Sequence, residues 1–245
     1  MTPNPFLTLF DGLEQQGPGS EASTKKALSL LPALPESPRI LDLGCGPGRQ
    51  TVTVAAETGG RVVAVDVYQP FLDQLSTRAE ARGVKVETRC QSMDQLSDPP
   101  GSYDLIWSEG AIYLMGLEKA LKRWRPLLAE RGLMAFTEAS WLVDVPPAEA
   151  LEFWVEAYPG MGSVAINRAK IAKLGFDILE TFPLPIGDWW TGYYMPLRER
   201  IEKLRPRAES WPELGEVLEA TEAEIELFER HHESYGYVFY LLRRR

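Results

Sequence analysis

Short apolar runs alternate along this chain with longer segments whose apolar residues have helical spacing. The short runs are apolar on both faces, as buried parallel strands are. Seven strands are predicted, over Ile40 and Leu41 with an end at Asp42, and over 61–65, 84–89, 103–107, 132–137, 176–182 and 236–242. Apolar residues three and four apart predict helices over 21–31, 49–57, 70–82, 116–128, 167–174 and 212–231. This alternation indicates an α/β fold with a doubly wound, mostly parallel sheet.

The first predicted strand leads into a glycine-rich turn. Asp42 is followed by Gly44, Cys45, Gly46 and Gly48, and a helix begins directly afterwards. Glycines allow a ligand to approach the backbone closely, and a helix N-terminus offers free N–H groups. The glycine spacing is one residue shorter than the dinucleotide fingerprint, which counts against a nicotinamide oxidoreductase. A turn that merely packs the helix on the strand is the purely structural alternative.

The run Asp42-x-Gly44-x-Gly46-x-Gly48 resembles the first motif of class I S-adenosyl-L-methionine (SAM) dependent methyltransferases. The likeness is to the prokaryotic, small-molecule type of unassigned substrate. It implies a Rossmann-like sheet of seven strands whose last strand is antiparallel. It also implies SAM as cofactor, S-adenosyl-L-homocysteine as product, and methyl transfer to a small-molecule acceptor. The loop from Asp42 to Gly48, with Cys45, would lie against the amino-acid end of the cofactor. A non-catalytic SAM-binding regulatory protein is the second alternative.

Further candidate cofactor residues follow the later strands. Asp66 ends the second strand, where an acid that binds ribose is expected in this architecture. The resemblance assigns Asp94 to the adenine amino group and Met93 to the face of the ring. For Asp94, a cap of the turn over 95–97 is an equally weighted interpretation. Glu109 follows the fourth strand, and under the resemblance one interpretation is that it binds the cofactor's ammonium group.

Two carboxylates and one tyrosine are the candidate catalytic residues. Glu109 and Glu138 are predicted at the tips of neighbouring strands, where each can act as a base or hold a cationic substrate. The alternative is hydrogen bonding to loop backbone or to the cofactor. Tyr113 can donate to the substrate or pack on the core. The residues after the fourth strand are Ser-Glu-Gly-Ala, unlike the Asn/Asp-Pro-Pro-Tyr of nucleobase and amide methylating enzymes.

Two aromatic insertions, 141–163 and 187–234, follow the ends of the fifth and sixth predicted strands. Aromatic surface over a cofactor cleft excludes water and favours an apolar or cationic small acceptor. A dimer interface is the alternative role. We expect a single domain over 1–245 with an N-terminal lid segment over 1–31. The predicted substrate contacts are Trp141, Trp154, Trp190 and Tyr194.

Composition narrows the possible partners and locations. The 245 residues carry a formal net charge of −9, which disfavours a protein that tracks nucleic-acid phosphates. The two cysteines have no metal-like spacing, and no carboxylate cluster resembles a magnesium site, so we expect no metal. No signal-peptide pattern or membrane-spanning apolar run is found. We therefore expect a cytoplasmic monomer or homodimer that acts apart from membranes and nucleic acids.

Overall fold

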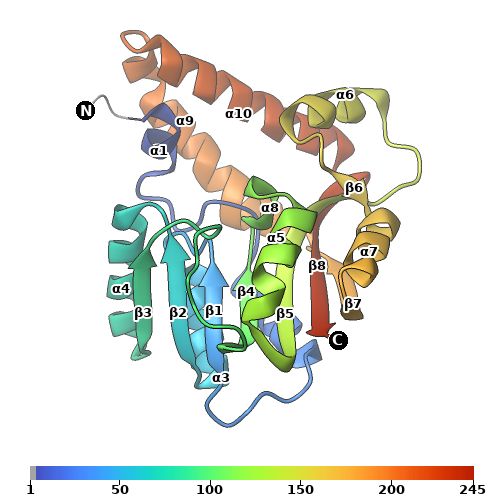
Figure 1. The fold of residues 1–245 in the computed structure, drawn as a ribbon. Coiled ribbons are helices and arrows are strands. Elements are labelled where there is room, and N and C mark those ends of the chain that lie inside the picture. The colour runs from blue at the N-terminus through green and yellow to red at the C-terminus, as the bar shows by residue number, and fades with distance from the viewer. Residues whose placement is uncertain (1–3) are drawn as a thin grey trace.

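A sheet of eight strands runs through the middle of the computed structural model, which describes residues 4–245 (Figure 1). Strand β8 is antiparallel to both of its neighbours, and the other pairs are parallel. The predicted sheet with an antiparallel last strand is confirmed, and a two-residue strand, β6 (Gly162–Ser163), is added beside β5. In sheet order the strands are β3 (Val86–Cys90), β2 (Arg61–Asp66), β1 (Arg39–Leu43), β4 (Tyr103–Ser108), β5 (Leu128–Trp141), β8 (Tyr235–Arg244) and β7 (Phe176–Pro183).

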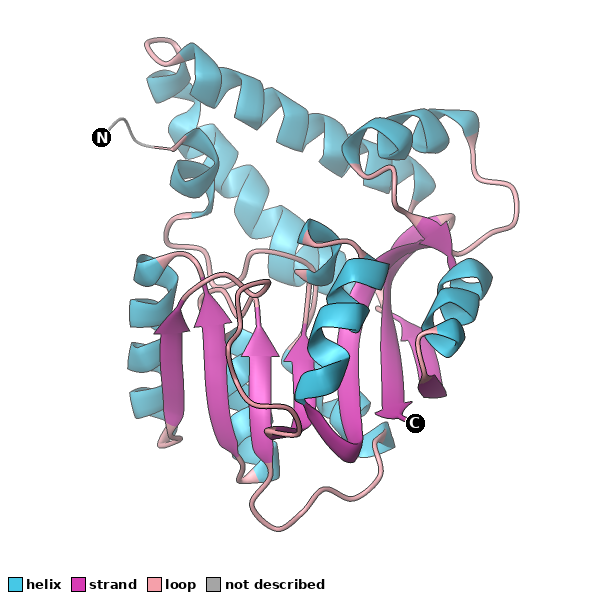
Figure 2. Cartoon of the chain, viewed as in Figure 1, coloured by secondary structure: helices cyan, strands magenta, loops and turns pink. Residues whose placement is uncertain are grey.

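Helices cover both faces of the sheet (Figure 2). Successive residues of β1 contact opposite layers, since Ile40 lies in the core under α2 and α3 and Leu41 in the core under α5. Both faces of the strand therefore require apolar side chains, as the sequence pattern predicts. One face carries α2 (Glu21–Leu30), α3 (Arg49–Thr58) and α4 (Gln69–Arg82), and the other carries η1 (Ile112–Leu114), α5 (Leu117–Trp124), η2 (Arg125–Leu127) and α7 (Val164–Lys173).

The helix ends follow local sequence signals. Ser20 caps α2 by accepting a hydrogen bond from the Ser23 N–H, as serine often does at this position. Gly83 ends α4 in the left-handed conformation that glycine adopts without strain. The core face of α4 has four buried residues with helical spacing; they are Phe71, Leu72, Leu75 and Ala79.

Strand β5 is longer than predicted, and this changes the position of Glu138. The ladder between β5 and β8 continues from Leu133 to Trp141, which pairs with Tyr235. Glu138 pairs with Val238 inside this ladder, three residues before the strand ends, and its side chain is buried. The prediction of Glu138 at a strand tip is therefore wrong. The antiparallel neighbour β8 forms hydrogen bonds with the backbone of β5 beyond the parallel part of the sheet. The local sequence of β5 does not reveal this pairing.

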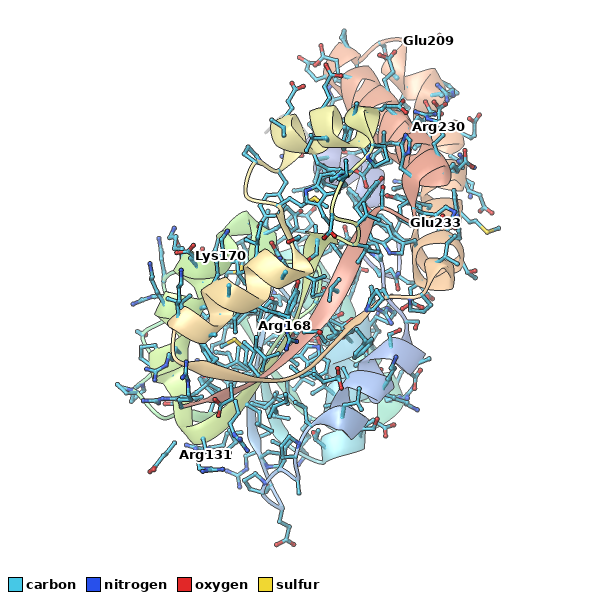
Figure 3. The ribbon with its side chains drawn as sticks, turned by 90° about the vertical axis from the view of Figure 1, so that its right-hand side faces the viewer. Arg131, Arg168, Lys170, Glu209, Arg230 and Glu233 are labelled. Atoms are coloured by element: carbon cyan, nitrogen blue, oxygen red, sulfur yellow. The ribbon has the colours of Figure 1, made fainter. Side chains whose placement is uncertain are left out.

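The two insertions form a helical cap beyond the carboxyl ends of β1 to β5 (Figure 1). Helix α1 (Pro5–Phe10) packs against this cap, whose apolar side chains make a separate core. Figure 3 shows Glu209 and Arg230 on the surface of the cap. No helix within residues 4–245 is long and apolar enough to cross a membrane. The cap consists of α6 (Ala148–Ala157), α8 (Ile186–Trp189), the π-helical turn η3 (Trp190–Tyr194), α9 (Met195–Ala208) and α10 (Pro212–His231).

Candidate active site

Two adjoining cavities lie between the carboxyl ends of the strands and the cap. The first, here named the loop cavity, has a volume of about 260 Å³ and is lined by the glycine loop, Asp66 and Glu109. The second, here named the cap cavity, has a volume of about 200 Å³ and is lined by aromatic residues from the cap, α1, η1 and β8. The two cavities share lining residues from the N-terminal segment and from η1, so a molecule in one lies beside a molecule in the other. These shared residues are Phe6, Gln16, Gly17, Pro18 and Tyr113.

The glycines of the loop have different structural roles. Gly44, Gly46 and Gly48 all have positive φ angles, of 68°, 53° and 83°. A Cβ on Gly48 would lie 2.1 Å from Leu75 Cδ1, so this glycine lets α3 pack on α4. A Cβ on Gly46 would only touch Gln16 at 3.5 Å. Gly44, Cys45 and Gly46 line the loop cavity, whereas Gly48 does not. The packing alternative therefore describes Gly48, and Gly44 has both roles, because a Cβ on it would lie 2.3 Å from Ala111 Cβ and it also lines the cavity.

Asp66 is held in place at the end of β2 by the backbone. Its Oδ2 accepts a hydrogen bond from the Gly46 N–H at 2.9 Å, and its Oδ1 accepts one from the Tyr68 N–H at 3.0 Å. The carboxylate lines the loop cavity. Each carboxylate oxygen has a second lone pair, so Asp66 can still accept hydrogen bonds from a ligand.

Asp42 lies under the loop and does not line the cavity. Its side chain is fully buried, and its Oδ2 accepts a hydrogen bond from the Thr51 hydroxyl at 2.6 Å. Its Oδ1 has no hydrogen-bond partner among the described residues. Burial raises the pKa of Asp42 to about 7, against the lowering effect of Thr51. Asp42 thus joins β1 to the first turn of α3 and supports the loop from below.

Met93 and Asp94 do not line the loop cavity. Trp124 Nε1 donates a hydrogen bond to the Met93 carbonyl oxygen. The Asp94 side chain accepts a hydrogen bond from Ser92 Oγ at 2.6 Å, and Lys119 Nζ lies 3.8 Å from it. The predicted capping of the turn over 95–97 is not seen either, because the partners of the Asp94 carboxylate are side chains.

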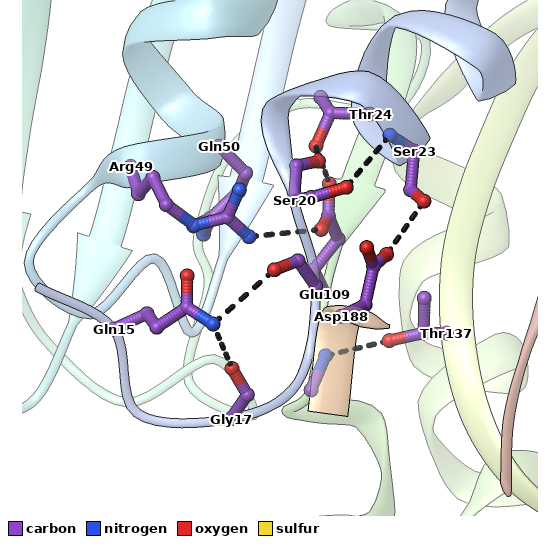
Figure 4. A network of polar contacts seen from close by, with 12 residues as sticks. Gln15, Gly17, Ser20, Ser23, Thr24, Arg49, Gln50, Glu109, Thr137 and Asp188 are labelled. Carbon is purple, nitrogen blue, oxygen red and sulfur yellow. Dashed lines mark hydrogen bonds and ion pairs between the residues drawn. The ribbon is translucent and has the colours of Figure 1, made fainter. Parts of the chain in front are cut away.

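Glu109 lines the loop cavity at the end of β4 (Figure 4). Its Oε1 accepts hydrogen bonds from Thr24 Oγ1 at 2.8 Å and from Trp107 Nε1 at 2.9 Å. Its Oε2 lies 3.8 Å from Arg49 Nη2 and has no hydrogen-bond partner within residues 4–245. Burial raises the pKa of Glu109, while Arg49 opposes this shift. One carboxylate oxygen is therefore available to a donor in the cavity.

The N-terminal segment is tied to both the sheet and the cap (Figure 4). Ser23 Oγ donates to Asp188 Oδ2 at 2.6 Å, and the Gly19 N–H donates to the Asp188 carbonyl oxygen. Gln15 Nε2 donates to the carbonyl oxygens of Gly17 and Gly19. These bonds fix the segment that forms a wall of both cavities. The first three residues of the predicted lid, 1–3, lie outside the described residues.

Glu138 lies behind a tyrosine of the cap cavity. The Tyr158 hydroxyl, which lines this cavity, donates to Glu138 Oε1 at 2.5 Å. Glu138 Oε2 is buried with no hydrogen-bond partner in the described part of the chain, and burial raises the Glu138 pKa to about 7. Tyr113 packs edge-on against Tyr158 with ring centroids 5.9 Å apart and lines both cavities. Tyr113 is therefore closer to a bound molecule than Glu138 is.

Of the four predicted substrate residues, only Trp154 lines the cap cavity. Trp141 packs edge-on against Tyr235 in the cap core, and Trp190 packs edge-on against Phe228. Tyr194 is fully buried in the same core. The sequence analysis had no signal to separate Trp190 and Tyr194 from their chain neighbours. Side chains absent from the predicted set that line the cavity include those of Phe10, Trp189, Tyr193, Thr221, Glu224 and Tyr237.

Residues 40–132 match a family model described as a methyltransferase domain. The chain is 23% identical over 190 residues to the sterol 24-C-methyltransferase of Pneumocystis carinii, an alignment that covers 73% of this chain and 50% of the relative. The chain spans about half the length of the curated relatives that it matches first. The match confirms the predicted resemblance to the methyltransferase family over the segment from β1 to the start of β5.

Two solved structures have the same fold over nearly the whole chain. One is a SAM-dependent methyltransferase from Thiobacillus denitrificans in complex with S-adenosyl-L-homocysteine, with a TM-score of 0.82, 23% identity, and 99% of each chain covered. The other is a SAM-dependent methyltransferase from Geobacter sulfurreducens in the same type of complex, with a TM-score of 0.81, 22% identity, and 99% of this chain and 98% of that chain covered. Both alignments span the cap segments and the last strand of this chain.

Proposed function

We propose that this protein transfers a methyl group from SAM to a small-molecule acceptor, since residues 40–132 match a methyltransferase domain model. The observation that carries the proposal is the pair of adjoining cavities. The loop cavity is bounded by the glycine loop, whose predicted ligand is the amino-acid end of SAM, and the cap cavity beside it suits a small acceptor. Neither an oxidoreductase nor a regulatory protein accounts for both cavities as directly.

The residues of the loop cavity fit this cofactor. Asp66 accepts hydrogen bonds from the ribose hydroxyls, as carboxylates at this sheet position do. The free Oε2 of Glu109 accepts from the ammonium group at the other end. When bound, SAM supplies a methyl group on a positively charged sulfur, and the acceptor forms a bond to that carbon while the broken bond's electron pair stays on sulfur. We keep Met93 and Asp94 outside this set.

The work of the protein is mainly to align the two reactants and to exclude water. Tyr113 stands where the two cavities meet, so its side chain can position the acceptor. The net charge of −9 disfavours a nucleic-acid substrate. Trp189, Tyr193 and Tyr194 are buried within one chain, which favours a role inside the cap over a dimer interface. The free cysteines, Cys45 and Cys90, suit the cytoplasm.

Calorimetry with SAM, S-adenosyl-L-homocysteine and NAD tests the cofactor assignment. We expect both sulfur compounds to bind and NAD to bind more weakly. Asp66→Ala should weaken binding of both sulfur compounds by about tenfold to a hundredfold, because hydrogen bonds to a charged group contribute roughly 1.5–3 kcal/mol. Asp66→Asn keeps one acceptor oxygen for the loop and should show a smaller loss. Tighter binding of NAD than of S-adenosyl-L-homocysteine would refute the proposal.

Incubation of the protein with SAM and a mixture of metabolites tests the activity itself. The acceptor is the compound whose mass increases by one methyl group, and S-adenosyl-L-homocysteine should form in equal amount. Binding of SAM without any such product would favour the regulatory alternative.

A further inference from the structure

The cap cavity combines many aromatic rings with a single carboxylate. Within the described residues, Glu224 is its only charged lining side chain, and no lysine, arginine or histidine lines it. The polar side chains of Gln16 and Thr221 complete the wall. An anionic acceptor would therefore meet a negative charge and no positive one. The eight aromatic residues of the lining are Phe6, Phe10, Tyr113, Trp154, Tyr158, Trp189, Tyr193 and Tyr237.

Glu224 differs from several acidic neighbours on α10. Glu222, Glu226 and Glu229 each lie within 4.0 Å of an arginine nitrogen on α9 or α10. Glu224 has no ion pair within residues 4–245, and its one hydrogen bond is to Oε1, from the Tyr194 hydroxyl at 2.8 Å. Burial raises the pKa of Glu224, against the lowering effect of Tyr194. Glu224 is half-buried at a cavity lined by aromatic rings, and its carboxylate has no cation partner among the described residues, so it can pair with a cation that a ligand supplies.

Glu224 also acts at the place where the two cavities meet. Burial, and after it the negative charge of Glu224, raise the pKa of Tyr113, which lines both cavities. The electric field of the Glu224 carboxylate therefore reaches the end of the cap cavity that is nearest to the loop cavity. Glu138, behind Tyr158, places a second carboxyl group near the same cavity. Glu224 is the one charged side chain in the described lining of the cap cavity, and its charge favours a positively charged guest.

On the basis of the proposed function, we propose that the methyl acceptor is a small amine that enters the cap cavity as an ammonium ion and pairs with the free Oε2 of Glu224. The faces of the surrounding aromatic rings attract the same cation. A neutral alcohol would leave Glu224 without a counter-charge, and a carboxylate or phosphate would be repelled. The cavity thus selects its guest by charge as well as by size.

Glu224 has a second role for an acceptor of this class. An ammonium nitrogen has no lone pair and cannot attack a methyl group. When one proton moves from that nitrogen to Oε2 of Glu224, the nitrogen regains its lone pair and the glutamate becomes a neutral acid. After transfer the methylated nitrogen carries the positive charge, and Glu224 returns its proton to solvent. Tyr194 stays hydrogen-bonded to Oε1 throughout and holds the carboxyl group in place.

A pair of probes of equal shape and different charge tests the proposal. Choline and 3,3-dimethylbutan-1-ol differ in a positively charged nitrogen against a neutral carbon. Calorimetry measures their binding to the protein saturated with S-adenosyl-L-homocysteine. We expect choline to bind at least about tenfold more tightly, which corresponds to about 1.4 kcal/mol. Glu224→Gln keeps an oxygen for Tyr194 and should remove most of this preference.

Glu219→Gln is the matched control, because Glu219 is an exposed acid on the same helix and does not line the cavity. It changes the net charge equally and should leave the choline preference intact. Failure of S-adenosyl-L-homocysteine to bind would overturn the proposed function, and with it this inference. Where that product binds, equal binding of the two probes overturns the inference alone. A reaction product that is methylated on a carboxylate or hydroxyl oxygen of the acceptor also overturns the inference alone.

Discussion

Glu138 carries a buried carboxyl group in the middle of a strand, and this position has a consequence for stability. Its pKa is raised from the ordinary value of 4.5 to about 7, first by burial. The folded state therefore keeps a proton that the unfolded state releases between these two pH values. The stability due to Glu138 is complete below pH 4.5 and is lost as the pH rises through about 7. The loss is on the order of 3 kcal/mol.

Glu138→Gln should remove this dependence, because an amide does not titrate and still accepts a hydrogen bond from Tyr158. Relative to the native protein, the variant should gain stability between pH 5 and pH 8. Denaturant unfolding at the two pH values measures the difference, and Glu219→Gln controls for the loss of one charge. The same stability difference at both pH values would show that Glu138 ionises in the fold without cost.

At the scale of single residues, the sequence predicts the location of residues that lie at the end of a strand. Asp66 and the glycine loop line the loop cavity because each follows directly after an apolar strand. Glu224 was not predicted, since it is one acid among many on an acidic helix. Only the packing of α10 on the cap shows which acid turns inward. Glu138 was predicted as a site residue on a strand end that the structure places three residues further along.

At the scale of elements, the two glycines that flank α3 provide a matched test of packing. Gly48 and Gly59 both have positive φ angles, of 83° and 62°. A Cβ on Gly48 would lie 2.1 Å from Leu75 Cδ1, whereas a Cβ on Gly59 would meet nothing within 4 Å. Gly59→Ala should therefore cost only backbone strain, about 1–2 kcal/mol. Gly48→Ala should add overpacking between α3 and α4, for a total of about 2–5 kcal/mol.

Denaturant unfolding of the two variants measures these costs. Equal losses would mean that α4 moves aside without penalty and that Gly48 is kept for its backbone angle alone. Binding of S-adenosyl-L-homocysteine to the folded fraction of Gly48→Ala is a useful second readout. Because Gly48 does not line the loop cavity, affinity should fall only as far as the loop is displaced.

The helices and strands were mostly predictable from the sequence. Which of their side chains line the cavity was not. The strands and α10 follow from apolar spacing that is local in the chain, and α10 has the predicted bounds. The cap aromatics lie on a helix with a π-helical turn at Trp190–Tyr194, where the ordinary helical period does not hold. Trp189 and Tyr193 line the cavity and are also buried in the cap core, whereas Trp190 and Tyr194 do not line the cavity. No pattern in the sequence marks that turn.

At the scale of the whole molecule, the N-terminal segment over 14–24 borders both cavities and is bonded to the sheet and the cap. Ser23 donates a hydrogen bond to Asp188 of the cap, and Thr24 donates one to Glu109 of the sheet, so we expect this segment to open when a ligand enters. We expect S-adenosyl-L-homocysteine to slow hydrogen exchange in the segment and over 187–196, as the ligand stabilises the closed arrangement. Ser23→Ala removes the bond to the cap and should speed exchange of the segment without ligand. Strand β7, which lines neither cavity, should not change. Protection confined to the glycine loop would show that the segment is no part of the binding site.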